Sequence, residues 1–266
     1  MLSCILELPL RCFDWDLYDP RYFHRKETWH YQTETWHYSC GMARQALMSV
    51  YRRHQFKKIQ FYQWFDIICE SDNPVVQGFL VEQLCLWVIA RDGLRAITPL
   101  GIDAPDGPIE TESFQQVPNW DSLINSTDRT SCLYLPDRFN YVNVDGAILQ
   151  ITSRNPKQAH LYLIQITLAK DHKDSETHFY QNQWWNWVQA LEKNCWSVES
   201  TFIWIDKKAP EQGVKAKKVQ VTHSGEHKLT PDHCYWQSGF QSLDNRFGKL
   251  GLAAAHRHRA EESCSY

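Results

Sequence analysis

Two short apolar runs separated by a polar connector constrain the fold of this chain more than any other feature. The runs cover residues 144–152 and 161–170, and both are rich in β-branched side chains. They are too short for a typical globular helix, and they have the length of buried strands. The connector, residues 153–160, contains Asn155 and Pro156, which are common turn residues. The pattern therefore predicts an antiparallel β-hairpin.

Polar residues interrupt this hairpin near one end. Folding the chain about Pro156 would bring Asp145 close to Gln165 and Thr167. Gln165 and Thr167 would share one face because side chains alternate along a strand. Three more polar residues follow the second run: Lys170, His172 and Lys173. Polar groups among apolar ones cost stability unless they are paired, so we expect this cluster to have a functional reason.

Three helices are predicted before the hairpin, over residues 42–54, 59–70 and 74–91. In each segment apolar residues recur at helical spacing. The third helix has the clearest ends, because Pro74 suits a first turn and Gly93 can end a helix. We expect these helices to precede and cover the predicted sheet.

The segment after the hairpin predicts a β-α-β unit. Residues 175–194 read as a helix with aromatic side chains on one side, and residues 198–205 read as a buried strand. Strands joined through a helix in one sheet are parallel, with a right-handed crossover. Residues 101–131, rich in Pro, Gly, Asp and Ser, are predicted to be a loop with little regular structure. The predicted fold class is α/β: a mixed sheet with an antiparallel hairpin and a β-α-β crossover.

These elements divide the chain into three predicted parts. Residues 1–73 form an irregular and helical N-terminal segment, residues 74–206 an α/β core, and residues 207–266 a polar, His-rich tail that begins with a basic linker. The motif Glu-Thr-Trp-His-Tyr occurs twice in the first part, at 27–31 and 34–38. Two copies are too few for a repeat architecture, so we interpret the motif as a local duplication. A metal or ligand role for His30 and His37 is the alternative.

Composition narrows the function classes. A net charge of −3 gives no overall basic field for non-specific nucleic-acid binding. Without any run of about 18 apolar residues, no membrane span is predicted. Glu7 interrupts the apolar N-terminus, which also lacks a preceding basic region, so no signal peptide is predicted. The nine cysteines are scattered without a CxxC pair, which argues against zinc or disulfides and favours a reducing, intracellular location.

Four stretches together resemble a known nuclease superfamily. They are Asp145-Gly-Ala-Ile-Leu, Gln165-Ile-Thr167, His172-Lys-Asp-Ser-Glu176 and residues 201–206. Across residues 74–206 the chain resembles the PD-(D/E)XK, restriction-endonuclease-like superfamily. Within it, the chain is more similar to the C-terminal domains of Crinkler effectors of oomycetes and fungi, which are related to trypanosomatid retrotransposon-hot-spot proteins. The expected fold is therefore a restriction-endonuclease-like core.

The resemblance implies a set of metal ligands. Asp145 matches the metal-binding aspartate of the first hairpin strand, and Glu82 matches a glutamate on the preceding helix. Gln165 occupies the position of a second acidic residue, and Thr167 that of a catalytic lysine. The implied magnesium ligands are Glu82, Asp145 and Gln165. Acidic and amide oxygens are ligands that suit such a hard cation.

The resemblance also implies an activity, Mg²⁺-dependent endonucleolytic cleavage of DNA. Asp145 and Gln165 would be catalytic, and Lys170, His172 or Lys173 would supply the charge that Thr167 cannot, with Lys170 or Lys173 assisting the water. An effector of this kind would act in a host nucleus. The alternative is an inactive copy that keeps the fold and binds nucleic acid or a host protein. A third interpretation is an inert, decaying member of an expanded gene family.

Overall fold

The computed structural model describes residues 23–28, 33–38, 74–99, 102–137, 141–167, 174–206, 215–219, 231–244 and 247. Contacts divide the chain into two compact units. The first comprises residues 1–84, 137–139 and 250–266, and the second comprises residues 85–136 and 140–249.

In the first unit, the strands β1 (Phe23–Thr28) and β2 (Thr33–Tyr38) form an antiparallel hairpin. An irregular segment was predicted there, because the sequence lacks the alternation of apolar residues that is typical of strands. Backbone pairing does not require this alternation, so a hairpin can form without it. The helices predicted over residues 42–54 and 59–70 lie outside the described residues. The third predicted helix is confirmed as α4 (Pro74–Asp92), whose second half belongs to the second unit.

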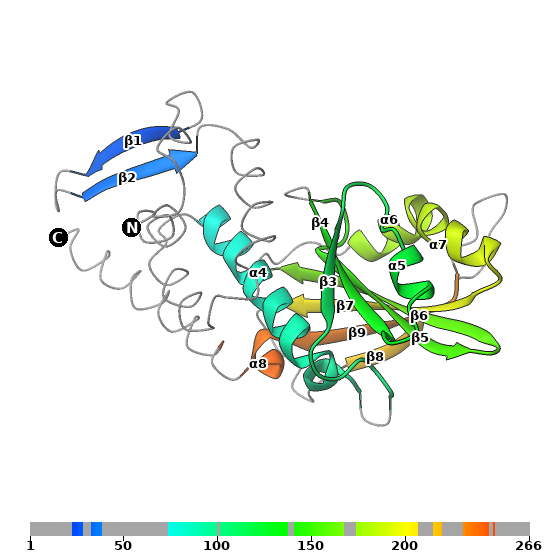
Figure 1. The fold of residues 1–266 in the computed structure, drawn as a ribbon. Coiled ribbons are helices and arrows are strands. Elements are labelled where there is room, and N and C mark those ends of the chain that lie inside the picture. The colour runs from blue at the N-terminus through cyan, green and yellow to red at the C-terminus, as the bar shows by residue number, and fades with distance from the viewer. Residues whose placement is uncertain are drawn as a thin grey trace. The chain divides into compact units, whose positions relative to one another are not determined.

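The second unit is built on a seven-stranded mixed sheet with the order β3-β4-β5-β6-β7-β9-β8 (Figure 1). Its strands are β3 (Glu110–Phe114), β4 (Ser131–Pro136), β5 (Gly146–Arg154), β6 (Lys157–Thr167), β7 (Ser197–Asp206), β8 (Lys215–Val219) and β9 (His233–Gly239). β5 and β8 run antiparallel to their neighbours, and all other pairs are parallel. The predicted α/β class with a mixed sheet is confirmed.

The predicted hairpin is formed by β5 and β6, with Gly146 opposite Ile164. Its turn is shorter than predicted, because only Asn155 and Pro156 separate the two strands. The remaining residues of the predicted connector continue the ladder, as in the pair Arg154 and Lys157. Most of these residues are polar because much of this end of the hairpin is exposed, and they therefore looked like a loop in the sequence.

The predicted β-α-β unit is also confirmed, with β7 parallel to β6 and Phe202 opposite Leu163. The single helix predicted between them is instead two helices, α6 (Ser175–Asn182) and α7 (Trp184–Lys193). Gln183 separates the two helices and stands at the start of α7. The break allows both helices to place aromatic residues on the sheet.

The sheet lies between two helical layers. Ala147 and Leu163 pack in one core cluster with Phe179 of α6, Trp187 of α7 and Trp120 beside α5 (Asp121–Ile124). We call this side the α6–α7 face.

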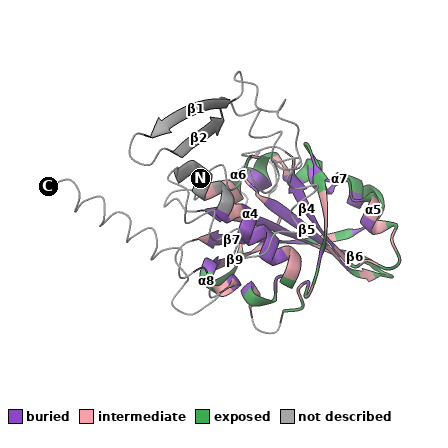
Figure 2. Cartoon of the chain, turned by 60° about the vertical axis from the view of Figure 1, so that its left-hand side comes forward, coloured by how far each residue is buried: buried purple, intermediate pink, exposed green. Residues whose placement is uncertain are grey.

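Gly146 points to the opposite side, the α4 face, because neighbouring strand residues alternate. There, a Cβ atom added at Gly146 would lie 2.9 Å from Leu86 Cδ2 of α4, so this glycine permits close approach of the helix. Figure 2 shows buried residues running through the central strands between these layers.

The loop predicted over residues 101–131 contains more structure than expected. It holds β3 and α5, and β3 pairs with β4 in parallel. The sequence looked like a loop because most residues are polar, yet Phe114, Trp120 and Leu123 are all buried and anchor the segment to the core. A few well-placed apolar residues are therefore sufficient to hold β3 and α5 against the core.

The predicted boundary after Asp206 also differs from the structure. Residues predicted as a linker and tail supply β8 and β9, and β9 inserts between β7 and β8. Trp236 of β9 is only 2% exposed, so this strand is part of the core. Its short length and polar flanks hid it from the sequence pattern. The short helices η2 (Arg95–Ile97) and α8 (Phe240–Leu243) complete the described part of this unit.

None of the helices in the described part of the chain is long and apolar enough to cross a membrane.

Candidate functional site

Several strands end at one edge of the sheet, which we call the carboxyl edge. The parallel strands β4, β6, β7 and β9 all end there, and β5 begins there (Figure 1). In open α/β sheets, ligands commonly bind outside the carboxyl ends of the strands. The two polar residues on which the sequence prediction rests lie at this edge.

Asp145 and Gln165 meet directly. The backbone nitrogen of Asp145 donates to Ile164 O at 2.8 Å, which extends the hairpin ladder by one residue before β5. Gln165 Nε2 then donates to Asp145 Oδ2 at 2.8 Å, and the backbone nitrogen of Ile166 donates to the same oxygen at 2.6 Å. The structure therefore brings together the aspartate and the amide that the sequence placed on neighbouring strands.

This contact orients the amide of Gln165. A carboxylate only accepts hydrogen bonds, so the nitrogen of the amide, not its oxygen, faces Asp145. Among the described residues, no donor bonds to Gln165 Oε1. The side chain is half-buried, and the hydrogen bond to Asp145 keeps its amide from rotating freely. The oxygen Oε1 is therefore fixed at the carboxyl edge.

The polar residues continue across the neighbouring strands. Thr167 of β6 stands opposite Asp206 of β7. Asp206 Oδ2 accepts a hydrogen bond from Gln237 Nε2 of β9 at 3.1 Å. Strand alternation places all of these side chains on the α6–α7 face. We call Asp145, Gln165, Thr167, Asp206 and Gln237 the carboxyl-edge cluster.

Two members of this cluster were not predicted from the sequence. Asp206 is the last residue of β7, whereas the apolar pattern predicted that this strand ends at residue 205. Its position at the carboxyl edge follows from the parallel pairing of β7 with β6. Gln237 lies in the segment predicted as a tail. The alternation within residues 233–239 was the available signal for it.

The other predicted site residues belong to the first unit or lie outside the described residues. Glu82 is half-buried on the part of α4 that belongs to the first unit, so its role as a ligand stays a prediction. Lys170, His172 and Lys173 lie outside the described residues. Within the described residues, no group of three or more His, Cys, Asp or Glu side chains could hold a metal ion.

A pair of side chains anchors the start of β9, the strand that carries Gln237. His233 Nε2 lies 2.7 Å from Glu176 Oε1 of α6, and His233 Nδ1 lies 2.9 Å from Pro231 O. The imidazole stacks on Tyr180, with 3.8 Å between ring centroids. Burial raises the pKa of Tyr180, so its hydroxyl stays protonated and donates to Ser200 Oγ at 3.0 Å. These contacts fix the strand that carries Gln237.

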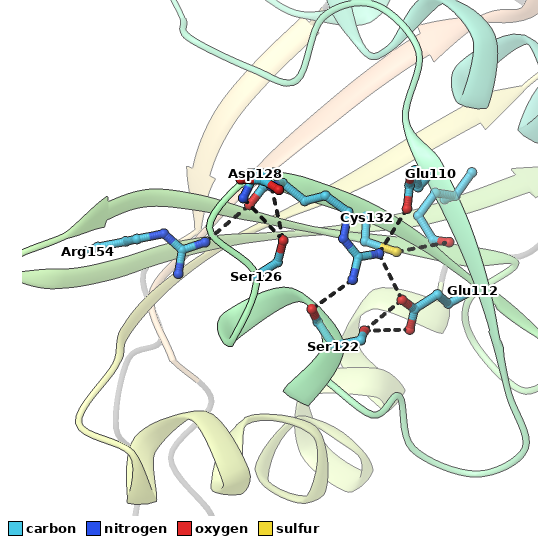
Figure 3. Close-up of polar contacts among 9 residues, drawn as sticks. Glu110, Glu112, Ser122, Ser126, Asp128, Cys132 and Arg154 are labelled. Atoms are coloured by element: carbon cyan, nitrogen blue, oxygen red, sulfur yellow. Dashed lines mark hydrogen bonds and ion pairs between the residues drawn. The ribbon is translucent and has the colours of Figure 1, made fainter.

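A second polar network lies beside the start of β4 (Figure 3). Arg129 Nη1 donates to Glu110 at 2.9 Å and to Glu112 at 3.2 Å, and Ser122 Oγ donates to Glu112 at 2.6 Å. Burial raises the pKa of the neighbouring Cys132 thiol to about 12, so it is no nucleophile at neutral pH. Arg129 binds both carboxylates and Ser122 binds that of Glu112, so the network ties β3 to α5 and has a structural role.

Comparison of the chain with protein-family models, with curated proteins and with solved structures gives no match.

Proposed function

We propose that the carboxyl-edge cluster belongs to a restriction-endonuclease-like domain of the Crinkler type, and that the protein cleaves DNA phosphodiester bonds with Mg²⁺. The direct contact between Asp145 and Gln165 carries this proposal. The order of elements supports it: α4, the antiparallel hairpin β5–β6, the helices α6 and α7, and the parallel strand β7. This is the arrangement on which the resemblance of the sequence rests.

The donor atoms at the edge suit a hard cation. Asp145 would contribute a carboxylate oxygen and Gln165 its Oε1. Mg²⁺ prefers oxygen ligands, keeps several waters and is often bound through only one or two carboxylates. A softer metal would require nitrogen or sulfur ligands. The amide oxygen is neutral, so we expect weaker binding than at a site with two carboxylates.

Each residue of the cluster then has a distinct role. A bound Mg²⁺ would polarise the phosphodiester and lower the pKa of a water molecule. Asp145 holds the amide of Gln165 in one orientation through Nε2, and this leaves Oε1 to bind. Thr167 offers a hydroxyl for positioning but no positive charge. Lys170 or Lys173, which follow β6, would orient the water and stabilise charge on the phosphoryl oxygens.

The proposal is tested with supercoiled plasmid, Mg²⁺ and the variant Asp145→Asn, which keeps the size of the side chain. We expect the natural protein to nick the plasmid. Altering a residue that only supports a metal ligand typically lowers activity by roughly 10–100-fold, so the cleavage rate of Asp145→Asn should fall by more than that. Asp128→Asn is the matched control, because Asp128 is exposed and lies in the loop before β4. Equal activity of Asp145→Asn, or no cleavage by the natural protein, would contradict the enzymatic role.

A second candidate function is nucleic-acid binding without cleavage. It is favoured by the chemistry of β6, where Gln165 is neutral, donates its nitrogen to Asp145, and is followed by the uncharged Thr167. Fluorescence anisotropy with labelled DNA in EDTA distinguishes the two functions. Binding that persists without divalent cations, together with an absence of cleavage in Mg²⁺, supports the binding module; cation-dependent cleavage supports the nuclease.

A further inference from the structure

The outermost strand β8 presents lysines on both faces of the sheet. Its sequence is Lys-Ala-Lys-Lys-Val. Lys215 stands opposite Gln237 of β9, and Lys217 stands opposite Tyr235. Because side chains alternate along a strand, Lys215 and Lys217 lie on the α6–α7 face with the carboxyl-edge cluster, whereas Lys218 lies on the α4 face.

Lys215 is in the same row of the sheet as Gln165. The paired residues across four strands are Gln165, Trp204, Gln237 and Lys215. Three steps between neighbouring strands separate the two ends of this row, or about 14 Å at the usual strand spacing. A nucleic-acid strand places several phosphates over that distance, since phosphates follow one another about every 3.4 Å along the axis of each DNA strand.

Among the described residues, no acidic side chain neutralises the charge of these lysines. Both side chains are exposed, and neither forms a salt bridge within the described residues. Lys217 Nζ lies 4.5 Å from the ring centroid of Tyr235, and this cation–π contact holds the ammonium group above the strand. Burial raises the pKa of Tyr235 to about 12, so the ring is a neutral phenol and no counterion.

We propose that β8 and β9 form a track for the phosphate backbone of DNA, in which Lys215 and Lys217 each neutralise one phosphate and lead the strand toward Asp145 and Gln165. The identity of the ligand rests on the proposed function. The chain carries a net charge of −3, so this local pair, and not an overall basic field, would attract the polymer.

Lysines on edge strands also have a protective role, because they discourage pairing with other chains. That role does not depend on the face of the strand, so it applies equally to all three lysines. A phosphate track on the α6–α7 face requires Lys215 and Lys217 but not Lys218. The two explanations therefore predict different results for variants that remove one charge from the same strand.

The test measures the affinity for a fluorescein-labelled DNA duplex in EDTA across a series of potassium chloride concentrations. We expect Lys215→Gln and Lys217→Gln each to lower the slope of log affinity against log salt by about 0.9, and the double variant by about 1.8. Lys218→Gln, the matched control, should leave the slope unchanged. Lys217→Arg should also leave it unchanged, because it keeps the charge and the contact with Tyr235.

The proposal is overturned if Lys218→Gln changes the slope as much as Lys215→Gln, if neither α6–α7-face variant changes it, or if the natural protein binds no duplex. EDTA separates this result from catalysis. Plasmid cleavage with an unaffected salt slope would remove the track and leave the nuclease, whereas the expected slopes without cleavage in Mg²⁺ would keep the track and remove the nuclease.

Discussion

The environment of His160 shows how burial sets the chemistry of a single residue. Its imidazole lies on the α4 face, stacks on Tyr162 with 4.3 Å between centroids, and places Nε2 2.8 Å from Thr201 Oγ1. Glu199 is 3.7 Å away, but this carboxylate is largely exposed and stabilises the charged ring little. Burial dominates and lowers the pKa of His160 to about 4.

This shift predicts a pH dependence of stability. Above pH 6.5, His160 is neutral in both the folded and the unfolded chain. Between pH 6.5 and about 4, the unfolded chain binds a proton that the folded protein excludes, so stability falls as the pH falls through this window. The full effect is roughly 3 kcal/mol at 1.36 kcal/mol per pKa unit.

Urea unfolding across this window, compared between the natural protein and His160→Gln, checks the prediction. The variant should lose this part of the pH dependence while the contribution of the carboxylates remains. Identical curves for the two proteins would show that burial does not control the protonation of His160.

At the scale of elements, the pair of Glu176 and His233 joins α6 to β9. Both ring nitrogens of His233 face oxygen atoms: Nε2 faces Glu176 Oε1, and Nδ1 faces the backbone oxygen of Pro231. The side chain of His233 is 4% exposed and that of Glu176 is 16% exposed, so water cannot easily replace either partner. Since β9 carries Gln237, this pair supports both the carboxyl-edge cluster and the proposed track.

We therefore predict that Glu176→Ala destabilises the protein by about 1–3 kcal/mol, the cost of leaving a buried polar group unpaired. Glu176→Gln should cost less, because its amide keeps a hydrogen-bonding group beside Nε2 of His233. Glu192→Ala is the control, since Glu192 is exposed on α7 and a surface change of this kind usually stays within about 0.5 kcal/mol. Urea unfolding measures these changes. Equal free energies of unfolding for Glu176→Ala and Glu192→Ala would refute the anchoring role.

At the scale of the whole molecule, the sheet extends well beyond the predicted core. β9 lies between β7 and β8, with Ile203 opposite Trp236. Trp236 also packs against Tyr162 of β6, with 5.7 Å between ring centroids. The strands after Asp206 therefore contribute to the same core as the hairpin, and the second unit depends on residues that the sequence assigned to a tail.

A chain that stops after Asp206 should consequently fail to fold cooperatively. It loses the buried Trp236, whose removal by Trp236→Ala alone should cost about 3–5 kcal/mol. It also exposes β7 as a new apolar edge that invites association with other chains. Urea unfolding and size-exclusion chromatography of the shortened chain check this. If the shortened chain were monomeric and unfolded at the same urea concentration as the full chain, the core would end at Asp206 as the sequence predicted.

The local parts of this protein follow from the amino-acid sequence alone. The hairpin, the parallel strand β7 and the meeting of Asp145 with Gln165 follow from apolar length, side-chain alternation and one short turn. These features depend on residues close in the chain, so the pattern contains most of what specifies them.

The positions of β3, β8 and β9 are set by tertiary contacts instead. These strands are short and largely polar, and their pairing depends on partners that the rest of the fold supplies. The contact of Asp206 with Gln237 and the place of Lys215 follow from that pairing. The stability of these short strands comes from neighbouring strands rather than from hydrophobic periodicity, and for this reason the sequence pattern did not reveal them.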